Sequence, residues 1–171
     1  MSLRRRFVHR LIIFFICLPP AGFVDASTVQ KLSFDRLIGE ADLIVRGRVE
    51  EVKSQQAPDR GSMTTIVTVS IERHFKGSKV SSVTIEQPGG SMGDIAQGVP
   101  GLPEFSSGED VVLFLKRQRG GTFKIVGGKQ GKFTAKTQPE SNNWVVEDFA
   151  RRTEGLDSFL SRLKNMIDTQ Q

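Results

Sequence analysis

The sequence is poor in the side chains that enzymes most often use for nucleophilic and metal chemistry. Its 171 residues include one cysteine, no tyrosine, one tryptophan and two histidines. The cysteine, Cys17, lies in an N-terminal segment that we expect to be removed, which leaves His74 as the histidine of the remaining chain. A thiol nucleophile, a Cys/His zinc site and a disulfide framework are then excluded, and a Ser-His-Asp triad would have to use His74. We predict no cofactor and no metal site.

Residues 1–26 have the three parts of a secretory signal peptide. Four arginines precede the apolar segment Leu11–Leu18, two prolines end it, and small residues up to Ala26 offer a cleavage site. The apolar segment is too short to span a bilayer, which takes about 20 helical residues. Ile16 stands before Cys17, where a lipoprotein signal needs a small residue. We therefore expect a secreted or periplasmic protein, cut near Ala26, with no transmembrane anchor after cleavage.

Removal of this segment changes the charge balance. The whole chain carries 24 Lys and Arg residues against 19 Asp and Glu residues, but four arginines and one aspartate precede residue 27. The net charge therefore falls from +5 to about +2, which weakens any argument for binding to a polyanion. The remaining length is that of one ordinary domain with a single hydrophobic core.

Periodicity predicts a mainly β domain after a short helical lead. The lead covers residues 27–40, with Ser33 available as an N-cap. Residues 41–54 alternate between apolar and polar, as in a strand with one solvated face, and Gly47 indicates a bend or a close neighbour. Further strands are predicted over Met63–Phe75, Ser81–Gln87, Val111–Leu115, Phe123–Val126 and Lys132–Ala135. Short strands with turn residues between them are typical of a small barrel or sandwich, here over residues 41–137.

Two other segments stand apart from this pattern. Residues 88–108 form a long loop rich in proline and glycine, and loops of this length in a compact domain are either functional or partly disordered. Residues 138–171 form a C-terminal extension, in which Trp144 and Phe149 flank a predicted late strand and are assigned to core packing. The extension ends in an amphipathic helix, because apolar residues recur at helical spacing from Leu156 to Ile167.

Three short motifs resemble the netrin-like module, the group that includes the tissue inhibitors of metalloproteinases. They are Ala41-Asp42 followed by Val45-Arg46-Gly47, then Phe75-Lys76-Gly77, and then Gly108 to Leu115. The resemblance implies an OB-like barrel of five or six strands, with another small β-barrel or sandwich as the alternative. The chain is also similar to small exported proteins of bacteria in which the same Pro/Gly loop precedes the Gly-Glu-Asp strand.

One departure limits what the resemblance implies. Tissue inhibitors place an N-terminal cysteine on the zinc of the protease, whereas this chain would begin near Ser27 and has no cysteine there. That chelating mechanism is not carried over to any residue of this sequence.

Other motifs have simple structural explanations. His74 is close in sequence to Glu72 but has no visible orienting partner, so we interpret it as structural or solvated. Gly89–Gly93 lacks the Lys-Ser/Thr and the helix of a P-loop. Glu109 and Asp110 point to opposite faces of a strand, which disfavours acid/base cooperation. Arg46 and Arg48 share a face that Lys124 would join on barrel closure, but this face has no aromatic residues, which disfavours nucleic-acid binding.

The loop is the best candidate for a binding site, because long loops on a rigid scaffold often carry recognition. Its apolar residues either tuck under the barrel or face a partner, and we favour tucking because exposed apolar clusters are uncommon. The predicted contact residues are Gly89, Gly90, Met92, Asp94, Val99, Leu102 and Phe105.

The resulting hypothesis is a non-enzymatic, exported β-barrel module that binds another exported protein, with a secreted protease as the first partner to test. One alternative is a hydrolase that uses Asp94, Glu104 and Glu109 with calcium or magnesium. Another is a structural component of a cell-envelope assembly.

Overall fold

The computed structural model describes residues 31–56, 62–139 and 141–170. The predicted signal peptide and residues 27–30 of the helical lead lie outside the described residues. Within these ranges, no helix has both the length and the apolar character needed to cross a membrane.

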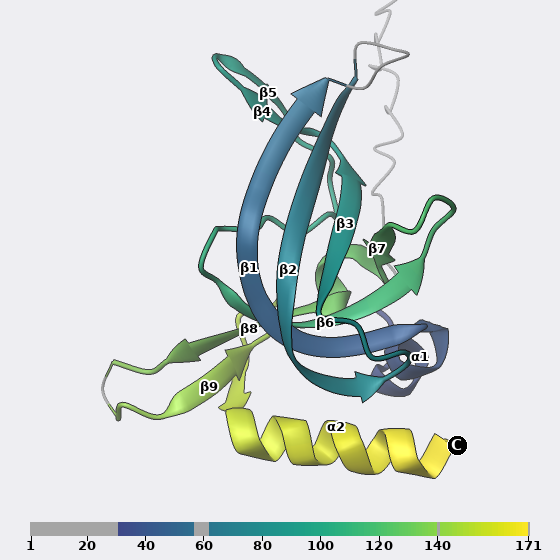
Figure 1. Cartoon of the computed structure of the whole chain (residues 1–171). Helices are drawn as coiled ribbons and strands as arrows, with labels where there is room; N and C mark the ends of the chain where they lie inside the picture. The colour runs from purple at the N-terminus through teal and green to yellow at the C-terminus, as the bar shows by residue number, and fades with distance from the viewer. Residues whose placement is uncertain (1–30, 57–61, 140, 171) are drawn as a thin grey trace, which may run out of the picture.

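The described chain folds into a closed five-stranded β-barrel with two helices (Figure 1). The barrel strands are β1 (Leu43–Gln56), β2 (Met63–Lys76), β3 (Ser82–Pro88), β6 (Asp110–Arg117) and β7 (Phe123–Ile125). Their order around the barrel is β1-β2-β3-β7-β6, and β6 pairs with β1 to close it. All of these pairings are antiparallel except that between β3 and β7. The predicted OB-like architecture is confirmed.

Strand alternation places one hydrophobic core inside the barrel and a second core outside it. On β6, Val111, Leu113 and Leu115 point into the barrel, whereas Val112 and Phe114 point outward beneath the helices. A strand that is apolar on both faces must be covered on both faces. The prediction that Val111–Leu115 is a central strand is therefore confirmed.

β1 is bent where the barrel closes. An added Cβ at Gly47 would lie 2.1 Å from the carbonyl oxygen of Ser70, and the β1–β2 register shifts beside Gly47 and again between Val49 and Glu51. These shifts are β-bulges, which increase the local bend of a strand. The close neighbour predicted from Gly47 is the backbone of β2.

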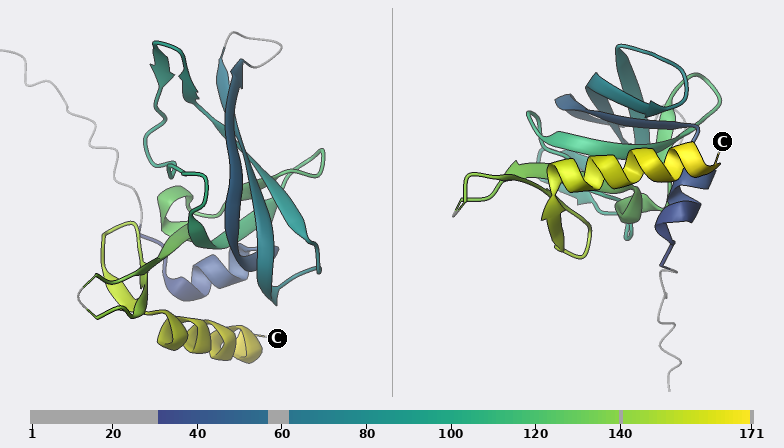
Figure 2. Two further views of the ribbon diagram at one scale, coloured as in Figure 1. Left: turned by 60° about the vertical axis from the view of Figure 1, so that its left-hand side comes forward. Right: turned by 90° about the horizontal axis from the view of Figure 1, so that it is seen from below.

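The helices and a second set of strands cover the outer face of the barrel at one end (Figure 2). Helix α1 (Phe34–Glu40) has Ser33 as its N-cap, as predicted, and the Ser33 side chain accepts a hydrogen bond from the amide of Arg36. Helix α2 (Leu156–Gln170) packs its apolar stripe on the same outer core.

The second set of strands extends the sheet beyond β6. It consists of β8 (Lys132–Thr137), β9 (Trp144–Glu147) and β10 (Thr153–Gly155). β8 follows the 3₁₀ turn Gly128–Gly131 and pairs with the same edge of β6 as β7 does. The late strand at Trp144 is confirmed, but the assignment of Trp144 and Phe149 to the core is wrong, because they are 47% and 45% exposed.

The proline- and glycine-rich loop contains a hairpin that the sequence pattern did not reveal. Strands β4 (Gly90–Met92) and β5 (Ile95–Gln97) pair with each other and form a separate two-stranded sheet. Gly93 has a φ of +59° and takes the first position of the turn, where a two-residue hairpin turn commonly requires glycine. β1, β2 and β3 continue past the closed part of the barrel, and the hairpin stands at that end, away from the helices (Figure 1).

Candidate binding cleft

A cleft of about 610 Å³ lies between the free end of the β1–β2–β3 sheet and the segment that joins β3 to β6. Val52, Ser54 and Thr65 contribute from the sheet, and Lys129 contributes from the 3₁₀ turn. The remaining lining comes from residues 87–91, 96–100 and 102–105. This volume falls within the range of about 300–1,000 Å³ that is typical of ligand sites.

Hydrogen bonds fix the hairpin that forms one wall of the cleft. The amide of Gly89 donates to the carbonyl of Met63 at 2.8 Å, and the carbonyl of Gly89 accepts from the Thr65 hydroxyl at 2.8 Å. The amide of Ser91 donates to Ser54 Oγ at 3.1 Å, and Gln97 Oε1 accepts from the amide of Met63 at 3.0 Å. The hairpin is thus attached to β1 and β2 on both of its strands.

Gly89 and Gly90 are required by this attachment. Both have a positive φ, and a Cβ at Gly90 would lie 2.5 Å from Ser54 Oγ and 2.6 Å from Thr65 Oγ1. A Cβ at Gly89 would lie 2.5 Å from the carbonyl oxygen of Gln97. Larger residues at either position would push the hairpin off the barrel.

The opposite wall is residues 98–108, which we call the strap, and it is tied to the barrel along its length. Gly101 accepts a hydrogen bond from the amide of Lys129, and Pro103 accepts one from Gln87 Nε2. Lys132 Nζ binds the carbonyl of Glu104 and the carboxylate of Glu109, and lies 4.5 Å from the ring centroid of Phe105. The strap is therefore ordered despite its glycines and prolines.

The inside of the cleft is largely uncharged. Val52 and Phe105 pack on the core inside the barrel, and the hydroxyl groups of Ser54 and Thr65 bond to each other and to the hairpin. Among the described residues that line it, the charged ones are Glu104 and Lys129. Gln87 Oε1 is buried and has no hydrogen-bond partner among the described residues. Such a lining suits an uncharged, partly apolar ligand.

Five of the seven predicted contact residues line this cleft. They are Gly89, Gly90, Val99, Leu102 and Phe105, and the last three are partly buried. Met92 and Asp94 lie instead at the exposed tip of the hairpin, where Met92 is paired with Ile95. Met92 and Ile95 are 49% and 67% exposed, so the expectation that they tuck under the barrel is wrong for these two residues. They form an apolar tip beside the cleft.

The three carboxylates of the hydrolase alternative, Asp94, Glu104 and Glu109, do not form one cluster. Glu109 binds Lys132 and Thr134, while Asp94 and Glu104 are exposed. The described residues contain no group of three or more histidines, cysteines and carboxylates placed to hold a metal ion.

Asp110 and Arg46 form an ion pair that the sequence pattern did not reveal. Asp110 is 6% exposed, and both of its oxygens accept hydrogen bonds from the Arg46 guanidinium, at 3.1 and 2.6 Å. These hydrogen bonds raise the pKa of Arg46. Glu109 pairs with Lys132, so the two adjacent carboxylates have different partners.

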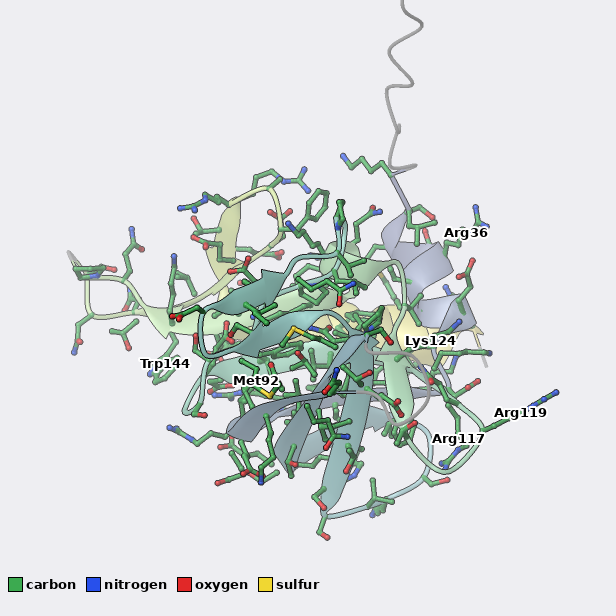
Figure 3. The ribbon with its side chains drawn as sticks, turned by 90° about the horizontal axis from the view of Figure 1, so that it is seen from above. Arg36, Met92, Arg117, Arg119, Lys124 and Trp144 are labelled. Atoms are coloured by element: carbon green, nitrogen blue, oxygen red, sulfur yellow. The ribbon has the colours of Figure 1, made fainter. Side chains whose placement is uncertain are left out.

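Arg46 and Arg48 share the outer face of β1, but Lys124 does not join them in one basic face. Arg46 packs against Trp144, with its guanidinium carbon 6.0 Å from the ring centroid, and Lys124 lies on the opposite side of the molecule from Trp144 (Figure 3). His74 is structural, as expected: its Nε2 lies 2.9 Å from the carbonyl oxygen and 3.1 Å from the amide nitrogen of Val80, in the turn between β2 and β3.

A second cavity of about 390 Å³ lies between the helices and β9, with Phe34, Phe133 and Phe159 among its lining residues. Asp148 and Arg152 pair at its rim. Burial raises the pKa of Asp148, but hydrogen bonds from the Arg152 guanidinium and from the amides of Arg152 and Ala150 outweigh it, so the pKa lies below its ordinary value of 3.8. A carboxyl group whose pKa is lower in the folded than in the unfolded chain stabilises the fold at pH values above its pKa in the unfolded chain.

Asp148→Asn should therefore remove a pH-dependent part of the stability. The wild-type chain should be more stable than the variant at about pH 5, and the difference should shrink as the pH falls below 3.8 through the folded-state pKa. Urea midpoints at about pH 5 and pH 2.5 measure this difference. An equal difference at both pH values would show that ionisation of Asp148 is not its cause.

No protein-family model matches the sequence, and a search of curated proteins finds no match either.

Proposed function

We propose that the chain is an exported, non-enzymatic β-barrel module that binds another exported protein through the cleft and the hairpin tip. The observation that carries the proposal is the pair of hydrogen-bonded walls, which hold the cleft open between the hairpin and the strap. A preformed site avoids the entropic cost of ordering loops on binding. Met92 and Ile95 beside it add the exposed apolar area that protein contacts commonly use.

A secreted protease is the first partner to test. This choice rests on the sequence resemblance to the netrin-like module alone, which is carried by Ala41-Asp42, Val45-Arg46-Gly47, Phe75-Lys76-Gly77 and Gly108 to Leu115. Because the chain has no cysteine after Cys17, the proposed inhibition works by surface contact and does not use the N-terminal cysteine by which the tissue inhibitors bind the protease zinc.

The double variant Met92→Asp/Ile95→Asp should weaken partner binding while leaving the fold intact, because both side chains are exposed. The chain is expressed with its N-terminus intact, and mass spectrometry of the exported product shows whether cleavage follows Ala26. A panel of purified secreted serine, cysteine, aspartic and metalloproteases is then titrated with the product. We expect inhibition of at least one protease, and a loss of at least about tenfold in affinity for the variant.

Lys79→Asp/Lys164→Asp is the matched control, because it adds two aspartates at exposed positions outside the cleft lining and the hairpin. It should inhibit like the wild type. Equal inhibition by the hairpin variant and the wild type would show that the hairpin tip does not contact the protease. Turnover of any substrate by the chain alone would contradict its non-enzymatic part.

A further inference from the structure

On the side that faces β6, β1 extends several residues beyond its last hydrogen-bonded partner. β6 pairs with β1 from Leu43 to Arg48, and Val49 exchanges hydrogen bonds with Gly108 and Glu109. From Glu51 to Gln56, β1 pairs with β2 on its other edge, but no described strand pairs with its outer edge. This free edge borders the cleft, since Val52 and Ser54 line it.

The ladder of β1, β2 and β3 shows which backbone groups face the cleft. In an antiparallel sheet, successive residues of a strand bond alternately to the strands on either side. The amide of Gly89 donates to Met63, so Met63, Thr65 and Val67 direct their backbone groups to β3. The residues between them, Thr64 and Ile66, therefore bond to β1.

Thr64 and Ile66 are paired with Gln55 and Lys53, so these two β1 residues use their backbone groups toward β2. Val52 and Ser54 consequently direct their N–H and C=O groups outward. Among the described residues, none hydrogen-bonds to these outward groups, because the bond from Ser91 goes to the Ser54 side chain.

Unpaired strand edges readily accept another strand, and proteins usually shorten, cover or charge them. Here the strap stands across the edge without pairing with it, and the space between them is the cleft. The edge therefore offers unpaired main-chain donors and acceptors beside a preformed cleft, which is the arrangement that β-strand addition uses.

The volume and charge of the cleft favour a peptide over a second copy of the chain or a nucleic acid. Its volume of 610 Å³ admits a short extended peptide and is too small to hold a second folded barrel. With one anion and one cation in its lining, Glu104 and Lys129, the cleft has no excess of positive charge for a nucleic acid.

We propose that an extended segment of the partner protein adds to the free edge of β1 and pairs with Val52 and Ser54. The inference rests on the proposed function and names its ligand. Alternate side chains of the segment are apolar and point toward Phe105 and Leu102, since these residues lie on the cleft side of the sheet. The side chains between them are polar and lie beside Glu51 and Lys53, which are exposed on the outer side.

The test uses a peptide selected from a random twelve-residue display library against the exported chain. Amide hydrogen exchange is measured by NMR with and without the synthetic peptide. We expect the amides of Val52 and Ser54 to exchange quickly in the free protein and at least about tenfold more slowly in the complex. The amide of Lys53, which faces β2, should be slow in both. N-methylation of the peptide should weaken binding at alternate positions only.

Two proline variants form a matched pair. Val52→Pro removes an N–H that faces the cleft and should weaken peptide binding at least about tenfold with the fold retained. Lys53→Pro removes a ladder N–H one residue away and should destabilise the protein. The exchange experiment decides the matter even if either variant fails to fold.

The inference is overturned if no peptide is recovered, or if a bound peptide leaves the exchange of Val52 and Ser54 unchanged. Slow exchange at both amides without peptide, together with a dimer in sedimentation, would assign the edge to a second copy of the chain. The proposed function survives any of these results if the protease titration still depends on Met92 and Ile95, and it fails separately if that dependence is absent.

Discussion

Phe159→Ala should lower the free energy of unfolding by about 3–5 kcal/mol, the usual cost of truncating a buried phenylalanine. Phe159 is 1% exposed, and its ring centroid lies 5.0 Å from that of Phe133 and 5.7 Å from that of Phe34. These rings join α1, β8 and α2 in one cluster with the outer face of β6. The cavity left by alanine would therefore weaken the contact between the barrel and everything that covers it.

Phe149→Ala is the control, because it makes the same chemical change at a residue that is 45% exposed. It should cost less than about 1 kcal/mol. Urea unfolding is followed by circular dichroism and by the fluorescence of Trp144, the single tryptophan of the chain. Coincident transitions would show that α2 unfolds together with the barrel. An early fluorescence transition in the wild type would instead show that residues 138–171 unfold on their own.

Asp110→Ala should destabilise the protein by about 2–3 kcal/mol, somewhat less than the usual cost of breaking a fully buried ion pair. The variant leaves the Arg46 guanidinium beneath Trp144 without its bidentate partner. The loss is moderated because the Arg46 side chain is 22% exposed and lies 4.0 Å from Glu72. Chemical denaturation at neutral pH measures the change.

Asp42→Ala provides the comparison for this ion pair. Asp42 pairs with Lys116, and both side chains are more than two-fifths exposed, so solvent screens the interaction. Its removal should cost less than about 1 kcal/mol. Equal losses for the two variants would show that burial of Asp110 contributes nothing to the strength of its pair with Arg46.

Local periodicity was sufficient to predict most of the fold. The alternation on β1 and β2, the doubly apolar β6 and the helical spacing on α2 each reflect a face that the barrel or the outer core buries. The β4–β5 hairpin was missed because its residues alternate without a buried face: all but Gly90 are exposed, and the hairpin is held by backbone and side-chain hydrogen bonds. Trp144 was placed in the core because size alone does not reveal which side of an edge strand is covered.

The cleft follows from the sequence only in part. The length and composition of residues 88–108 pointed to a segment of which five proposed residues line the cleft. The roles of Gly89 and Gly90 depend on Ser54 and Thr65, which are distant in sequence. The free edge of β1 depends on where β6 begins and on the bulge after Val49, and neither can be predicted from hydrophobic periodicity.

The junction of β3 with β7 has a mechanical consequence. A single parallel residue pair, Ile85 with Phe123, joins these two strands, while every other junction of the barrel extends over several residues. Separation there would convert the cylinder into a curled sheet and leave each antiparallel ladder whole. We therefore expect the barrel to open first between β3 and β7, with β3 still paired to β2 and β1 still paired to β6.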